Sequence, residues 1–161
     1  MRRLVLVVIG VAVAAIVGWG LLVSIRPGVP VETDTTTGAK TMDFAGQGLT
    51  AFPTEALKHP ELQELDISRN AIGAIPAEIG HLSELTVLRA SHDGLTGIPA
   101  EIGHLPKLRY LDLSDNSLTG LPHELADLKS LQTLVLTGNA DLSQADLDYI
   151  TSRSPGLEII H

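Results

Sequence analysis

The segment Leu85–Lys107 reads LTVLRASHDGLTGIPAEIGHLPK, and Leu108–Ser130 continues it as LRYLDLSDNSLTGLPHELADLKS. The segment before them, Leu62–Glu84, has the same pattern of leucine, asparagine and proline. Four prolines recur at one constant interval along the chain, at Pro53, Pro76, Pro99 and Pro122. A fixed period of this length indicates a stack of repeats in which each unit covers its neighbour.

Each unit begins with a short apolar pattern that predicts a strand. In the first full unit the apolar residues are Leu62, Leu65 and Ile67, so the end of the segment alternates as a strand with one buried face does. Asn70 follows shortly after this strand, where the chain must turn. An amide side chain both donates and accepts, so it can satisfy backbone groups inside the turn. After each proline, apolar residues three positions apart predict one short helical turn on the opposite side.

The spacing L-x-x-L-x-L-x-x-N-x-L-x-x-L-P-x-x-L-x-x-L resembles that of the leucine-rich repeat family. The resemblance is specific, since Ile75–Leu82 recurs unchanged as Ile98–Leu105, and it covers about residues 41–161, or about five units including the caps. It implies an α/β solenoid with short parallel strands on a concave face and short helical turns on a convex face. It also implies a protein-interaction domain, in a small, membrane-anchored member of bacterial type.

Residues 1–26 have a different character from the repeats. Leu4–Ile25 contains no charged side chain and is as long as the roughly 20 residues that cross a bilayer as a helix. Arg2 and Arg3 precede this run, and their charge favours a cytoplasmic N-terminus. We therefore expect a transmembrane signal anchor over 1–26, a flexible linker over 27–40 and a repeat domain in the periplasm or outside the cell. The prolines, glycines and threonines of the linker favour an extended tether.

A cleaved signal peptide is the alternative for this segment. Ala12-Val13-Ala14 has the small-x-small form of a cleavage site. Cleavage there would leave a hydrophobic tail over Ala15–Ile25, which favours the uncleaved anchor. The chain has no cysteine, so the exported domain must be stabilised by its packed core and not by disulfides.

The charge of the chain limits its partners. Three of the eleven basic residues and none of the nineteen acidic ones lie in the expected anchor, so residues 27–161 are strongly acidic. Such a domain is a poor candidate for nucleic acid or for anionic lipid surfaces. We expect a neutral or basic protein partner and no cofactor.

The concave face is where binding is expected, because its side chains point away from the core. Parallel strands lie about 4.8 Å apart, so equivalent residues of successive repeats stand side by side. The middle repeat is unusual, with Arg89 where its neighbours have aspartate and Ala90 and Asp93 where they have larger apolar residues and asparagine. The candidate binding residues are Glu64, Asp66, Val87, Arg89, His92, Tyr110 and Asp112.

A simpler interpretation is that Arg89 only neutralises an acidic column. Exposed ion pairs are common and contribute little to stability. In the family that the chain resembles, aspartate is frequent in the L-D-L-S segment, so Asp66 and Asp112 carry little information individually. Both interpretations stay open from the sequence.

Other chemistry finds little support in the sequence. His81, His104 and Asp127 share one repeat position, but they belong to a copied outer segment that offers no fourth ligand, so we do not expect a metal site. We find no nucleophile turn, phosphate loop or paired-histidine motif, and we therefore predict that the protein is not an enzyme. A structural envelope component or a single-span signalling subunit is the alternative to a recognition module.

The C-terminal segment is expected to close the stack. Ser143 can cap a helix over Ser143–Ser152 with Leu147 and Ile150 facing inward. Leu157, Ile159 and Ile160 then predict a last strand. This unit would shield the last core layer, as a terminal repeat must.

Overall fold

The computed structural model describes residues 40–161. The expected anchor over 1–26 and all of the expected linker except Lys40 lie outside these residues. Within residues 40–161, no helix is both long enough and apolar enough to span a membrane.

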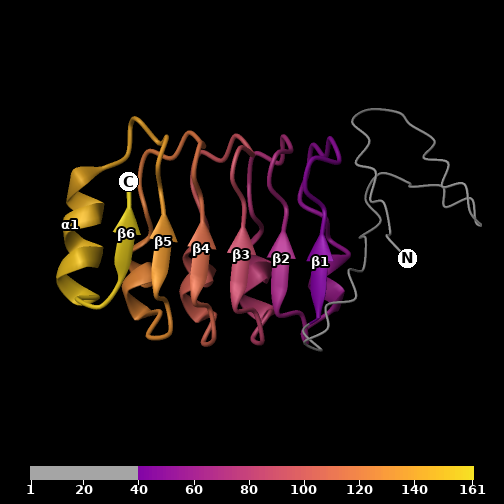
Figure 1. Ribbon diagram of the computed structural model, residues 1–161, viewed down its shortest axis with the longest axis horizontal. Coiled ribbons are helices and arrows are strands. Elements are labelled where there is room, and N and C mark those ends of the chain that lie inside the picture. The colour runs from indigo at the N-terminus through magenta and orange to yellow at the C-terminus, as the bar shows by residue number, and fades with distance from the viewer. Residues whose placement is uncertain (1–39) are drawn as a thin grey trace, which may run out of the picture.

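Six short parallel strands form a single sheet, in which the strands follow one another in sequence order. The helical segments that connect the strands all lie on one side of this sheet (Figure 1). The strands are β1 (Thr41–Asp43), β2 (Glu64–Asp66), β3 (Val87–Arg89), β4 (Tyr110–Asp112), β5 (Thr133–Val135) and β6 (Glu158–Ile160). The helices are the 3-10 turns η1 (Ala56–Lys58), η2 (Ala77–His81), η3 (Ala100–His104) and η4 (His123–Asp127), and the α-helix α1 (Gln144–Arg153). This arrangement confirms the expected solenoid of parallel strands.

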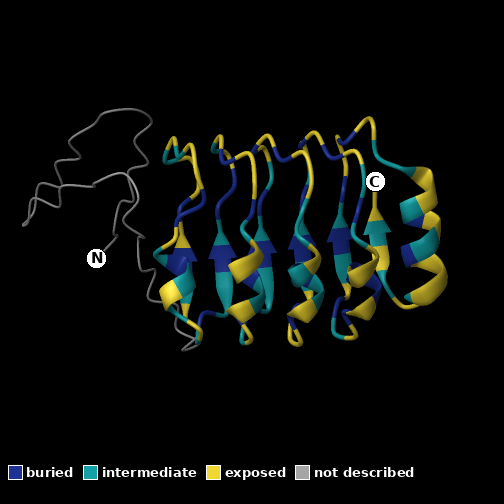
Figure 2. Cartoon of the chain, turned by 180° about the vertical axis from the view of Figure 1, so that it is seen from behind, coloured by how far each residue is buried: buried dark blue, intermediate teal, exposed yellow. Residues whose placement is uncertain are grey.

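The core lies between the sheet and the helical turns, and every repeat contributes the same side chains to it (Figure 2). Leu65, Leu88 and Leu111 sit at the centre of consecutive strands, in register with one another, and each is 0% exposed. Each β2–β5 strand has one buried residue between two partly exposed ones. Because so short a strand buries little by itself, its stability depends on the neighbouring repeats.

Asparagine side chains join consecutive repeats behind the strands. The Asn116 Oδ1 atom accepts a hydrogen bond from the Leu95 N–H at 3.0 Å. Its Nδ2 group donates to the Ala90 carbonyl at 2.8 Å and to the Leu113 carbonyl at 2.9 Å. Asn70 makes the equivalent bonds two repeats earlier, with Leu49 and with carbonyls on both sides. The amides thus satisfy buried backbone groups of two repeats at once, as the sequence predicts.

Asp93 occupies the same position in the middle repeat but lacks the donor. Its Oδ1 atom accepts from the Asn70 N–H at 3.0 Å, whereas its buried Oδ2 atom has no partner. Burial raises the pKa of Asp93 from 3.8 to about 6, and the charge of Asp66 adds to this shift. The Asn70 hydrogen bond and the neighbouring His92 oppose the rise in pKa. The fold therefore favours the neutral acid, which can still donate one hydrogen bond.

The helical turns pack so closely that two repeats require glycine. A Cβ atom on Gly103 would lie 2.5 Å from the Glu124 carbonyl oxygen, and one on Gly80 would lie 2.9 Å from that of Glu101. The equivalent residue of η4 is the buried Ala126, which packs next to α1 instead of another 3-10 turn. Close approach of neighbouring backbones thus explains why the segment around these glycines recurs unchanged.

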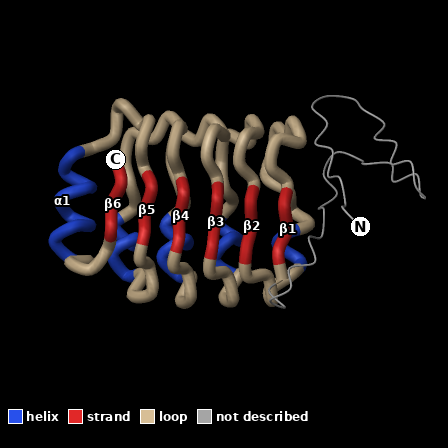
Figure 3. The backbone as a smooth tube through the Cα atoms, in the orientation of Figure 1, coloured by secondary structure: helices blue, strands red, loops and turns tan. Residues whose placement is uncertain are grey.

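The last unit is longer than the others. Successive strands from β1 to β5 keep the constant period of the repeats, but Thr133 of β5 pairs with Glu158 of β6, two positions later than that period would place its partner. The extra length holds α1, whose N-cap Ser143 accepts a hydrogen bond from the Asp146 N–H. Figure 3 shows α1 beside β6, at the end of the stack. The expected closing helix and strand are both confirmed.

The close packing of η3 against η4 gives a test of the fold. We expect Gly103→Ala to lower the free energy of unfolding by about 1–3 kcal/mol, because the added methyl group meets backbone that has no room to move. Gly97→Ala in the same repeat is the matched control, since a Cβ atom at Gly97 meets nothing within 4 Å. Urea denaturation measures the free energy of unfolding of both variants. Equal stability of the two variants would contradict the packing argument.

Asp93 makes stability depend on pH. The neutral acid is favoured when folded, so the contribution of Asp93 is greatest below pH 3.8 and is lost as the pH rises through about 6. Asp93→Asn supplies the missing donor without a charge and should stabilise the fold. We expect the gain to be smallest near pH 4 and to grow by about 2–3 kcal/mol towards pH 7.

Urea denaturation across this pH range measures the gain. Asp115→Asn, which removes an exposed carboxylate one repeat later, is the control for loss of one charge. A gain for Asp93→Asn that is the same at every pH would show that ionisation of Asp93 does not govern stability.

Candidate functional site

The outer side of the strands, here termed the sheet face, is the one that the resemblance predicts to be concave. Its side chains come from the first and third residue of each strand, because the middle residue points into the core. The first row is Thr41, Glu64, Val87, Tyr110, Thr133 and Glu158, and the second is Asp43, Asp66, Arg89, Asp112, Val135 and Ile160.

Arg89 lies at the centre of the sheet face. The register sets it between Asp66 and Asp112, as the sequence predicts. The contacts of its head group are diagonal ones: Nη1 lies 3.7 Å from Glu64 Oε2, and the guanidinium carbon lies 5.6 Å from the centre of the Tyr110 ring. The Arg89 and Glu64 side chains are 41% and 40% exposed, so this ion pair is weak and can exchange for a partner's groups. One side chain thus links β2, β3 and β4.

The two aspartates beside Arg89 bind their own turns. Asp66 Oδ1 accepts from the Ser68 N–H at 2.9 Å, and Asp112 Oδ1 accepts from the Ser114 N–H at 3.0 Å and its hydroxyl at 2.7 Å. These bonds fix the ends of β2 and β4. The aspartates therefore have a structural role in addition to the negative charge that they give to the sheet face.

His92 lies in the turn after β3 and not on the strand itself. Its φ of 58° is in the left-handed region, as is the φ of 51° at the equivalent Asp115. The His92 Nε2 atom lies 3.6 Å from Asp115 Oδ2, and both side chains are about half exposed. Of the other predicted site residues, Val87 lies beside Tyr110 in the first row of the sheet face. Asp115 was not among the predicted site residues. It occupies the same position in its repeat as His92 does in the repeat before, and this could have indicated that the two side chains lie close together.

The second row of the sheet face is apolar at its C-terminal end, whereas the first row ends at the exposed Glu158. Val135 and Ile160 are in register on β5 and β6. Ile160 is 43% exposed, and among residues 40–161 it is the exposed large hydrophobic side chain. Ile160 was predicted to lie in the last strand but was not assigned to the candidate surface.

The histidine column lies away from the sheet face. His81, His104 and Asp127 are the exposed last residues of η2, η3 and η4. In the described part of the chain, no three His, Cys, Asp or Glu side chains are placed to hold a metal ion.

Comparisons with known proteins show which family the repeats match. Residues 91–140 match one model described as leucine rich repeat, and residues 61–82 match a second. No curated protein matches the chain.

Three solved structures are similar. The leucine-rich repeat protein LIC12759 of Leptospira interrogans is 41% identical with a TM-score of 0.66, and the match covers 70% of this chain and 28% of that one. An internalin of Listeria monocytogenes, inlF, is 23% identical with a TM-score of 0.60, covering 74% and 33%. The plant peptide hormone receptor RGFR1, in complex with RGF2, is 30% identical with a TM-score of 0.53, covering 68% and 22%.

The chain thus spans about a third or less of the length of each of these proteins. At 23% identity, the similarity to the internalin shows a common fold and nothing further. The repeat spacing, the two family models and the parallel solenoid agree: residues 61–82 and 91–140 are leucine-rich repeats, and the chain carries the fold of the leucine-rich repeat family.

Proposed function

We propose that the repeat domain is a recognition module that binds a neutral or basic protein or peptide on its sheet face, without catalysis. The observation that carries this proposal is the Arg89 centre, where one cation contacts Glu64 and Tyr110 from two neighbouring strands. Arginine and tyrosine are among the side chains that most often dominate binding energy at protein interfaces. Here both project from short strands whose positions are fixed by the core, so little order must be gained on binding.

The two ends of the sheet face define the chemistry of the partner. Asp43, Glu64 and Asp66 give the β1–β2 end a negative charge. At the β5–β6 end Val135 and Ile160 make the second row apolar, beside the exposed Glu158 of the first row. Four strand spacings separate β2 from β6, which is about 19 Å at about 4.8 Å each. An extended peptide spans that distance with about six residues. The surface therefore suits a segment with a basic residue at one end and an apolar residue about six positions away.

A similar structure supports a peptide partner. The plant receptor RGFR1, which shares 30% identity over 68% of this chain, is in complex with RGF2, and RGFR1 is described as a peptide hormone receptor. A solenoid of this kind can thus present a surface to a peptide. The identity of the partner of this chain does not follow from that similarity.

We further propose that residues 4–25 anchor the domain in a membrane and that the repeats lie on its non-cytoplasmic side. The support is the sequence itself, because Leu4–Ile25 has no charged residue and Arg2 and Arg3 precede it. An anchored module acts on partners that reach the same membrane surface.

Substitution of the Arg89 centre tests the binding surface. We expect Tyr110→Ala and Arg89→Glu each to weaken capture of the partner by the full-length chain at least about tenfold, as loss of a central contact does. Lys107→Glu is the matched control, since Lys107 also forms an exposed ion pair with a glutamate of the previous repeat, Glu84, but lies outside the strands of the sheet face. Quantitative pull-down of identified partners measures the effect. Partners that survive both sheet-face substitutions bind elsewhere.

A reporter fusion tests the orientation. We expect a reporter that is active only outside the cytoplasm to work when it is fused after His161 of the intact chain. Deletion of residues 1–26 should abolish its activity and release the fusion from the membrane fraction. Activity of a cytoplasm-dependent reporter at the same position would overturn the orientation, and a shortened, soluble product of the intact chain would show cleavage.

A further inference from the structure

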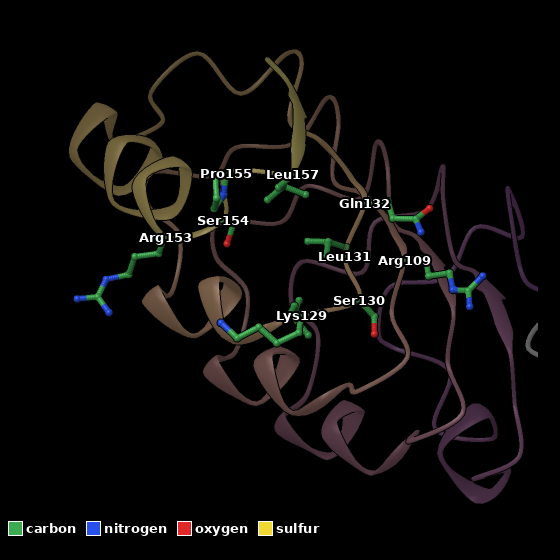
Figure 4. A pocket seen from close by; sticks show the side chains of 11 residues that line it. Arg109, Lys129, Ser130, Leu131, Gln132, Arg153, Ser154, Pro155 and Leu157 are labelled. Atoms are coloured by element: carbon green, nitrogen blue, oxygen red, sulfur yellow. The ribbon is translucent and has the colours of Figure 1, made fainter.

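A cavity of about 460 Å³ opens at the edge of the sheet where the chain leads into β5 and β6. The segment after η4 forms one side of it, and the segment after α1 forms the other (Figure 4). Leu131 and Leu157 supply apolar wall, and Arg109, Lys129 and Arg153 supply positive charge. This volume is within the range of sites for small molecules.

The longer last repeat explains why the cavity exists. Thr133 pairs with Glu158, and continuing this register by two residues sets Gly156 opposite Leu131. The three earlier residues of the same row, Leu62, Leu85 and Leu108, are at most 1% exposed, whereas Leu131 is 7% exposed. At this place the last repeat has a glycine, and Leu157, one position later, packs only partly buried against the core. A Cβ atom at Gly156 would meet nothing within 4 Å, so the space beside it is open.

The charge around the cavity is unusual for so acidic a domain. Residues 40–161 contain eight basic side chains of lysine and arginine. Four of them pair with glutamates, namely Lys40, Lys58, Arg89 and Lys107. Of the other four, three line this cavity, and the lining contains no aspartate or glutamate. The unpaired positive charge of the described domain is thus concentrated at one place.

None of the three basic groups forms an ion pair with a carboxylate of residues 40–161. Lys129 Nζ donates to the Ala126 carbonyl at 3.0 Å, the Arg153 guanidinium stacks 4.7 Å from the Tyr149 ring centre, and the Arg109 guanidinium has no partner within residues 40–161. Figure 4 shows the Arg109 and Arg153 head groups on opposite sides of the cavity, directed outward. Both side chains are exposed, so they can turn inward by rotamer changes that take only nanoseconds.

We propose that this cavity binds a small organic phosphate. Its phosphate group would be bound by Lys129, with Arg109 and Arg153 closing on it from either side, and its apolar part would rest on Leu131 and Leu157. Three cations favour a group with two negative charges over a single carboxylate, and guanidinium groups match the oxygens of a phosphate in pairs. The site is separate from the sheet face and does not depend on the function proposed for that face.

Calorimetric titration of the full-length chain with phenyl phosphate tests the proposal, with ionic strength held constant. We expect saturable binding with half-saturation on the order of 1 mM or below. Inorganic phosphate, which lacks the apolar part, and benzoate, which has one charge, should each bind at least about tenfold more weakly. Absence of saturation by phenyl phosphate, or equal binding of benzoate, would overturn the proposal.

Two variants locate the site. Gly156→Leu fills the cavity, keeps every charge and should abolish binding, and Lys129→Gln should weaken it at least about tenfold. Arg69→Gln is the matched control, because Arg69 is the remaining unpaired cation of residues 40–161 and lies outside the cavity. It should change binding less than about twofold. Equal loss in Lys129→Gln and Arg69→Gln, or full binding by Gly156→Leu, would show that phosphate meets only general surface charge.

Discussion

The structure depends on hydrogen bonds that each repeat makes to the backbone of the repeat before it. Asn116 and Asn139 accept from the Leu95 and Leu118 N–H groups, and their amides donate to carbonyls on both sides. No unit can satisfy its own turn, so none can be stable without its neighbour. A repeat that departs from this rule carries an unmet polar atom, as Asp93 does. Burying such an atom without a partner costs free energy. A substitution at the asparagine position therefore affects the stability of the units on both sides.

The same stacking rule divides the surface into regions with different freedom to vary. On the side of the helical turns, backbones come so close that Gly80 and Gly103 have no room for a side chain. On the sheet face, side chains point into solvent, and the strand spacing sets only where they stand and not what they are. The row that contains Asp66, Arg89 and Val135 can therefore change from acidic to basic to apolar without disturbing the core. This freedom is the physical reason why the residues of the proposed recognition site lie on the sheet face.

The repeat period was enough to predict the strands, the asparagine bonds and the short helical turns, because each follows from one local rule applied again in successive units. The closing helix, where the period breaks, was predicted from its Ser143 cap and the spacing of Leu147 and Ile150. It also predicted that Arg89 lies between Asp66 and Asp112. It did not predict that Arg89 contacts Glu64 and Tyr110, since the direction of a long side chain depends on rotamers and not on register. The pairing of His92 with Asp115 was missed, although both residue types are enriched in the left-handed region and the two share one position in successive repeats. The cavity was missed because it arises from the glycine at 156, whose place in the row appears only once β5 and β6 are paired.

The last repeat is the place where a solenoid can acquire a second kind of chemistry. Inside the stack, a leucine in every repeat closes the row that contains Leu108 and Leu131, so no cavity can form there. At the end, α1 lengthens the repeat, the row receives Gly156, and the space beside Leu131 opens. The net charge of −8 does not exclude an anion from this space. Charges more than about 8 Å away are largely screened at physiological salt, so the three nearby cations decide the local potential and the distant carboxylates do not. A surface that suits a basic partner and a cavity that suits an anion can therefore exist in one small domain.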